Sequence, residues 1–234
     1  NGRLVSGTQT AYTLALNFDM LPKAERQQAA ERLVDNIKNY GNHLTTGFLG
    51  TPYLCHVLTR FGYTDMAYNL LLQEKYPSWL YPVKMGATTI WERWDGIKPD
   101  GSFQVPSMNS YNQYSYGAIG ELMYRVMAGI DTYEDGVGYK HIQIKPHIGG
   151  GFTNASASLQ TYYGVLSSGW KVENDKTLMD IVIPVNTMST VYVPAKHASA
   201  ITESGAAVSS DVRMEDGYAL MTLGFGAYHF SITK

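Results

Sequence analysis

The chain has 234 residues, enough for one large domain or for two ordinary domains that each bury a core. Its formal net charge is −2 and it has no cluster of Lys and Arg, which argues against a nucleic acid as partner because phosphate binding needs concentrated positive charge. No stretch approaches the roughly 18 apolar residues that a membrane span requires, so the sequence predicts no membrane span.

The first 130 residues have the spacing of amphipathic helices. Apolar residues recur three and four positions apart, as in Ala30, Leu33 and Ile37, which places them on one helical face. Pro22 suits the first turn of this helix, and Gly62 suits the end of the next one. The predicted helices cover about residues 9–20, 22–40, 52–61, a segment beginning at residue 64, and 111–128.

These helices are joined by short turns, and such pairs form αα-hairpins. Hairpins whose apolar stripes face one another close into a toroid, and an (α/α)6 toroid contains six of them. The sequence predicts five helices, too few to close such a ring. Residues 1–130 are therefore predicted to form only part of an (α/α)6 barrel.

Past residue 131 the pattern changes to that of β-strands. In the segment 141–145, Ile142 and Ile144 share one face and the polar residues share the other. Turn residues such as those at 173–175 and 215–217 separate the segments. The seven predicted strands cover about residues 141–145, 155–162, 164–172, 178–184, 190–193, 219–223 and 227–233. They indicate an antiparallel β-sandwich over residues 131–234, so the predicted fold class is multidomain, α then β.

The densest group of candidate functional residues lies at 86–96. Glu92 and Asp95 stand three residues apart, among an arginine and the tryptophans Trp91 and Trp94. In a helix the two carboxylates would share a face, whereas in an extended chain only one would reach a pocket. A carboxylate framed by tryptophans suits glycoside hydrolysis, because aromatic walls hold a sugar ring and lower the local dielectric constant. The alternative is a structural ion pair of Glu92 with an arginine, with both tryptophans in the core.

Three segments resemble motifs of the bacterial α-L-rhamnosidase family and occur in the family's order. Residues 88–95, TTIWERWD, resemble its signature near the C-terminal end of the toroid. Residues 43–52, HLTTGFLGTP, resemble its loop facing the substrate cleft, and residues 110–117, SYNQYSYG, resemble the start of its last barrel helix. The similarity continues through residues 139–142 and covers the chain up to about Trp170.

This resemblance implies an inverting glycoside hydrolase that removes terminal α-L-rhamnosyl residues, with Glu92 as the general base that activates water. Inversion needs two carboxyl groups roughly 6.5–9.5 Å apart. The resemblance also implies that residues 1–130 are the C-terminal portion of the (α/α)6 catalytic barrel. It places the general acid before Asn1, so we expect the isolated chain to be inactive. The candidate substrate-binding residues are Trp91, Trp94, Gln113, His43 and Asp95.

Gln113 is a departure from the family pattern, because members usually carry a histidine at this position. Glutamine still donates and accepts hydrogen bonds, but it cannot carry a proton near neutral pH. The sugar preference, or the tuning of the base, is therefore in doubt. A non-catalytic carbohydrate-binding or scaffolding protein stays open as an alternative, as does another (α/α)6 glycosidase or a polysaccharide lyase.

Several other residues have a structural interpretation beside a functional one. His43 could reach a sugar hydroxyl or simply cap its loop, and the lone Cys55 is predicted to be buried core rather than a catalytic thiol. Tyr162, Tyr163 and Trp170 could form a sugar platform or pack inside the sandwich. No spacing of His, Cys, Asp and Glu fits a metal site and no phosphate-binding glycine loop precedes a helix, so neither metal nor cofactor is predicted.

The partner implied by the resemblance is a rhamnose-containing glycan or glycoside. An incomplete barrel also leaves an apolar helix face unpaired, so we expect self-association through the helical half. No signal peptide is present, but the chain begins at Asn1 rather than Met, which leaves the compartment open. A periplasmic or secreted location is favoured for a protein that degrades glycans.

Overall fold

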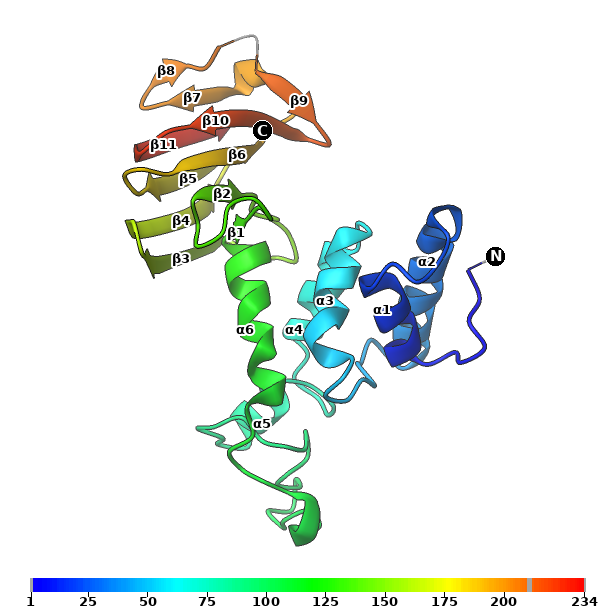
Figure 1. Cartoon of the computed structure of the whole chain (residues 1–234). Coiled ribbons are helices and arrows are strands. Elements are labelled where there is room, and N and C mark those ends of the chain that lie inside the picture. The colour runs from blue at the N-terminus through cyan, green and yellow to red at the C-terminus, as the bar shows by residue number, and fades with distance from the viewer. Residues whose placement is uncertain (1, 210–211, 234) are drawn as a thin grey trace. The chain divides into compact units, whose positions relative to one another are not determined.

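The computed structural model describes residues 2–209 and 212–233, and the chain divides into two compact units (Figure 1). The first unit, Asn1–Gly120, is helical, and the second, Glu121–Lys234, combines the end of a helix with two β-sheets. The predicted order of helices followed by a β-sandwich is confirmed. The domain limits predicted at 1–130 and 131–234 stay a prediction, because compact packing alone does not define a domain.

The helices of the first unit bury the apolar faces that the sequence predicts. Leu33 and Ile37 are fully buried, Ala30 is nearly so, and α1 packs against α2 and α3 while α3 packs against α4. Cys55 lies in this core as predicted, and burial raises the pKa of its thiol to about 12, so the thiol is protonated at neutral pH. The helices are α1 Gln9–Asn17, α2 Lys23–Asn39, α3 Thr51–Arg60, α4 Thr64–Leu71 and α5 Leu80–Lys84, with a 3₁₀ turn η1 at Pro106–Met108.

The helix predicted at 111–128 begins later and is less regular than the sequence suggests. Helical turns start at η2, the 3₁₀ segment Tyr114–Ala118, and continue through α6, Ile119–Leu122, into η3, a π-helical turn at Met123–Met127. The Gln113 side chain caps η2 by accepting the Ser115 N–H at 2.9 Å. Residues 111–113 lie outside the helix, and the Gln113 N–H donates to the Ile90 carbonyl at 2.8 Å instead.

The second unit is a sandwich of two sheets. All seven predicted strands are present, and the described part of this unit also contains four short strands of two or three residues that were not predicted. The sheets have the strand orders β1-β2-β6-β10-β9 and β3-β4-β5-β11-β7-β8, and their pairs are antiparallel except that β2 runs parallel to β6. The strands are β1 Ile130–Thr132, β2 His141–Ile144, β3 Asn154–Thr161, β4 Gly164–Glu173, β5 Lys176–Ile183, β6 Met188–Pro194, β7 Ile201–Glu203, β8 Ala206–Ala207, β9 Arg213–Glu215, β10 Tyr218–Leu223 and β11 Gly226–Thr233, with a 3₁₀ turn η4 at Ala198–Ala200.

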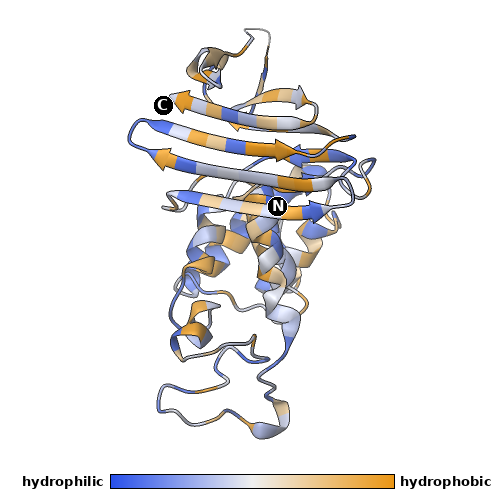
Figure 2. Ribbon diagram, turned by 90° about the vertical axis from the view of Figure 1, so that its left-hand side faces the viewer, coloured by the Kyte–Doolittle hydropathy of each residue, from blue (hydrophilic) through white to orange (hydrophobic). Residues whose placement is uncertain are grey.

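Alternation along the strands builds the core of the sandwich. Apolar and polar residues alternate along the strands in Figure 2, and the inward set includes Ile142 and Ile144 from β2 and Ile181 from β5. The predicted turns are also present: Asn174 has a φ of 48°, while Asp216 and Gly217 have φ values of 47° and 81°. Asn, Asp and Gly tolerate this left-handed conformation, which fits the tight turns of the hairpins they close.

The helix end is fastened to the sandwich by side chains of β4. The Trp170 indole N–H donates to the Met127 carbonyl at 2.7 Å, and the Ser168 hydroxyl donates to the Ala128 carbonyl at 2.6 Å. Trp170 is 4% exposed, so the hypothesis that it forms a sugar platform is wrong. These two bonds satisfy carbonyl groups that the end of a helix leaves without an intrahelical partner.

His147 gives the second unit a predicted dependence on pH. Burial, and then the charge of Lys145, lower the pKa of the imidazole from 6.5 to about 4. The unfolded chain therefore binds this proton more tightly, and stability should fall as the pH drops from about 6.5 towards 4. Between pH 7 and pH 5 we expect a loss of about 1 kcal/mol, less than the shift alone implies because the ring is partly exposed.

The measurement is urea unfolding of the chain at pH 7 and pH 5, compared with His147→Gln. The variant should lose less stability than the wild type on acidification, because its side chain at this position no longer titrates. An equal loss in both proteins would contradict the role given to His147.

Candidate active site

The candidate residues of the TTIWERWD segment lie in a loop that forms a hairpin-like arm. The segment is neither helix nor regular strand. Its backbone pairs with the end of the same loop, since the Glu92 N–H donates to the Ser110 carbonyl at 2.8 Å and Gln113 donates to Ile90. Further out, Ile97 and Phe103 form an isolated antiparallel bridge. In this arm, residues 89–113, the segment 88–95 lies beside the segment 110–117.

Glu92 has a half-buried side chain with one oxygen held in place. Its Oε2 accepts the backbone N–H of Ser110 at 2.7 Å. Within the described residues no ion pair joins Glu92 to an arginine: Arg93 pairs with Asp95 at 3.5 Å and Arg60 pairs with Asp19. The alternative of a structural Glu92–arginine pair is therefore not what the structure shows.

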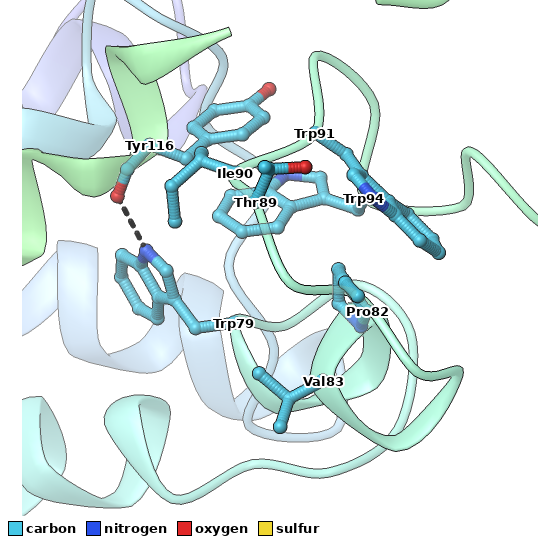
Figure 3. Close-up of a pocket in the computed structure, with 9 residues that line it drawn as sticks. Trp79, Pro82, Val83, Thr89, Ile90, Trp91, Trp94 and Tyr116 are labelled. Carbon is cyan, nitrogen blue, oxygen red and sulfur yellow. Dashed lines mark hydrogen bonds between the residues drawn. The ribbon is translucent and has the colours of Figure 1, made fainter. Parts of the chain in front are cut away.

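Aromatic side chains surround this loop. Trp94 stacks on Tyr116 with ring centroids 3.8 Å apart and lies edge-on to Trp79 at 5.4 Å. The Trp79 indole N–H donates to the Tyr116 carbonyl at 2.9 Å, the dashed line in Figure 3. Trp91 lies edge-on to Tyr111 at 5.5 Å. Trp91 and Trp94 are 5% and 9% exposed, so each packs mainly against protein in this chain.

The two tryptophans nevertheless line a hollow. It contains about 300 Å³ of unoccupied space, part of it open to solvent. Its walls come from α5, the start of the arm and η2 (Figure 3), and Glu92 is not among the lining residues. The lining residues are Trp79, Pro82, Val83, Ala87, Thr89, Ile90, Trp91, Trp94 and Tyr116.

Asp95 and Gln113 are both engaged in contacts that order the arm. Asp95 accepts a hydrogen bond from the Gln104 amide at 2.5 Å in addition to its pair with Arg93. Gln113 uses its side-chain oxygen on Ser115, both at the backbone N–H and at the hydroxyl, each at 2.9 Å. The Gln113 side chain thus serves as a helix cap, while its amide nitrogen has donors to spare.

His43 lies in the α2–α3 loop, where Gln9 and Gly41 contact it. Its Nδ1 lies 2.8 Å from the Gly41 carbonyl, and its own carbonyl accepts the Gln9 amide at 3.1 Å. No described contact links it to Glu92. The same loop reaches the aromatic group through Phe48, whose ring lies 5.0 Å from that of Tyr116.

Sequence reasoning missed the residues that brace the arm, above all Gly96, Asn109 and Tyr111. The Gly96 carbonyl accepts hydrogen bonds from the Asn109 amide at 3.0 Å and from the Tyr111 hydroxyl at 2.9 Å. Gly96 ends the group at 86–96 and Tyr111 belongs to the segment 110–117, but nothing in their spacing shows that they meet.

Among the described residues, no group of three or more His, Cys, Asp or Glu side chains could hold a metal ion. Within the same residues, no helix is long and apolar enough to cross a membrane.

Helical hairpins followed by a β-sandwich, with Glu92 in a loop that also carries Trp91 and Trp94, fit the architecture of a helical-hairpin glycosidase with an appended β-domain. The family model of the bacterial alpha-L-rhamnosidase 6 hairpin glycosidase domain matches residues 1–127. The model of the bacterial alpha-L-rhamnosidase C-terminal domain matches residues 129–207. The chain belongs to the bacterial α-L-rhamnosidase family.

Relatives with this name match most of the chain or nearly all of it. An α-L-rhamnosidase of Streptomyces avermitilis is 43% identical over 232 residues, 99% of this chain and 22% of that protein. One from Formosa agariphila is 43% identical over 203 residues, covering 86% of the chain and 22% of the relative. The chain therefore spans about a fifth of the length of these relatives.

Solved structures agree with the fold. The S. avermitilis α-L-rhamnosidase complexed with L-rhamnose superposes with a TM-score of 0.91 at 43% identity, over 97% of this chain and 22% of that one. The α-L-rhamnosidase of Aspergillus terreus superposes with a TM-score of 0.87 at 34% identity, over 100% of this chain and 25% of that one.

Proposed function

We propose that a full-length protein containing this chain removes terminal α-L-rhamnosyl groups from glycosides with inversion, and that Glu92 is its general base. The family supports glycoside hydrolysis as the reaction and a rhamnose-containing glycoside as the substrate. The chain spans 22% of the length of its S. avermitilis relative, and the proposal assigns the general acid to the part of the full-length protein before Asn1.

The observation that carries the assignment of the base is the state of the Glu92 carboxylate. One oxygen is fixed by the Ser110 N–H at 2.7 Å, and no arginine or lysine among the described residues forms an ion pair with the other. A general base needs this combination of a fixed orientation and a free oxygen within hydrogen-bond reach of a water molecule. Asp95 lacks it, since Arg93 and Gln104 engage both of its oxygens.

The alternatives are weaker on the same contacts. A polysaccharide lyase would need a tyrosine or histidine base and a cationic neutraliser beside a uronate, and Arg93 beside Glu92 already pairs with Asp95. A non-catalytic sugar-binding protein is favoured by one observation, the glutamine at position 113, which cannot carry a proton near neutral pH.

The test is incubation of the full-length protein with a rhamnosyl disaccharide, followed by NMR from the first minutes. We expect free rhamnose whose first-formed anomer is β, because inversion of an α-glycoside gives the β-anomer. Release of α-rhamnose first would overturn inversion. An unsaturated uronate from a polyuronate substrate would favour the lyase, and rhamnose binding without turnover would favour the binding protein.

We also expect the isolated chain to self-associate through its helical unit. Large apolar side chains are exposed on this unit, among them Phe18 at 58%, Met20 at 72% and Leu49 at 74%. Exposed apolar side chains favour association in water, because association removes them from solvent. Sedimentation velocity at several concentrations should show species larger than a 26.0 kDa monomer. A single monomeric species at all concentrations would contradict this expectation.

A further inference from the structure

We propose that Asn109 and Tyr111 are positioning residues for Glu92, acting through the carbonyl oxygen of Gly96. They hold the backbone of Ser110, the residue that fixes the Glu92 carboxylate. This inference rests on the proposed function, in which Glu92 is the general base.

The carbonyl oxygen of Gly96 accepts hydrogen bonds from several residues on the returning half of the arm. It accepts three hydrogen bonds: from the Gln104 N–H at 3.0 Å, from the Asn109 amide at 3.0 Å and from the Tyr111 hydroxyl at 2.9 Å. The Asn109 amide also donates to the Tyr111 oxygen at 2.9 Å. A carbonyl oxygen has two lone pairs, so the three donors share one acceptor and crowd around it.

Ser110 lies between Asn109 and Tyr111 in the sequence and makes two hydrogen bonds to Glu92. Its N–H donates to the Glu92 carboxylate at 2.7 Å, and its carbonyl accepts the Glu92 N–H at 2.8 Å. The side chains on either side of Ser110 in the sequence therefore fix the backbone that orients the base. Tyr111 adds a second brace, because its ring meets Trp91, the residue before Glu92, edge-on at 5.5 Å.

The space around Gly96 shows how closely these groups are packed. A Cβ at this position would lie 3.0 Å from the Trp91 ring, 3.1 Å from the Asn109 side-chain oxygen and 3.3 Å from the Tyr111 ring. That Asn109 oxygen is buried and has no hydrogen-bond partner in the described structure. The contacts of Asn109 are thus made by its amide N–H groups, while its buried oxygen loses a hydrogen bond that water would provide.

The chemical consequence concerns the second oxygen of Glu92. A general base must stand within hydrogen-bond reach of the attacking water, and a displacement of about 1 Å can lower the rate by about 100-fold. With Oε2 fixed by Ser110, Oε1 is the oxygen left to accept the proton of the water. Removing the hydrogen bonds of Asn109 or Tyr111 to the Gly96 carbonyl should therefore lower the rate of the chemical step and leave sugar binding nearly unchanged.

The experiment is a double-mutant cycle in the full-length protein with an aryl α-L-rhamnoside. Tyr111→Phe keeps the ring and removes the hydroxyl, and Asn109→Ala is the second variant should the first fail to fold. Each should lower kcat by about 10- to 100-fold, with KM changed less than about threefold. In a Glu92→Gln background the same changes should lower kcat no further, because the group they position is already disabled.

Ser102→Ala is the matched control, since it removes a hydroxyl hydrogen bond in the same arm, to Asp100 at 2.6 Å, away from Gly96. It should change kcat less than about twofold. An equal fall in kcat for Tyr111→Phe in both backgrounds would overturn the positioning role, because a structural defect acts whether or not the base is present. If Glu92→Gln alone leaves kcat unchanged, the assignment of the base itself is overturned.

Discussion

Replacing Glu92 by glutamine in the full-length protein is expected to lower kcat on an aryl α-L-rhamnoside by about 1,000-fold. Glutamine preserves the size of the side chain and can still accept the Ser110 N–H, but it cannot take a proton from water. Because the loss falls on the chemical step, rhamnose binding measured by calorimetry should change little.

Glu121→Gln is the control for this variant. Glu121 carries an exposed carboxylate, which pairs with Arg125 at 2.6 Å on the helix surface. Its loss should leave kcat unchanged within about twofold, because exposed ion pairs contribute little. A fall of less than about tenfold for Glu92→Gln would show that another group activates the water.

The second large effect is expected on stability, from Trp170→Ala. This side chain is 4% exposed and donates to the Met127 carbonyl, so the substitution removes a large buried ring and leaves an acceptor without its donor. We expect the free energy of unfolding of the chain to fall by about 3–5 kcal/mol, measured by urea denaturation with circular dichroism as the readout. Trp170→Phe should lose only about 1–2 kcal/mol, since most of the apolar contact remains.

Tyr162→Ala is the control for this result. Tyr162 lies in the turn that joins β3 to β4, the strand of Trp170, and it is 98% exposed. The substitution should change stability by no more than about 0.5 kcal/mol. A loss below about 1 kcal/mol for Trp170→Ala would mean that the helix end is not fastened to the sandwich through this residue.

The regular elements could be predicted because their periodicity is local. The stripe of α2 and the alternation of β2 depend on neighbours three, four or two positions away, which the sequence displays directly. Strands β1, β7, β8 and β9 have two or three residues each, too few to show alternation. The late start of the last helix was missed because the pairing of Gln113 with Ile90 joins residues 23 positions apart.

The candidate site was proposed from motif resemblance rather than from periodicity. The motif segments identify the loop that carries Glu92, Trp91 and Trp94, and the structure shows that this loop pairs with residues 110–113. What spacing could not reveal is the meeting of Asn109 and Tyr111 at the Gly96 carbonyl, 13 and 15 positions away. Contacts of this kind depend on how an irregular loop folds back, and no periodic pattern encodes them.

The fastening of the helix end to β4 has a consequence for anyone who wishes to dissect the protein. A recombinant sandwich cut just before Ile130 would lose the Met127 and Ala128 carbonyls, leaving the Trp170 indole and the Ser168 hydroxyl as buried donors without acceptors. A fragment starting at Glu121 keeps both acceptors and also the Arg125 pairs with Glu121 and Asp131. The nine residues before the first strand thus belong, for purposes of expression and solubility, to the module that follows them.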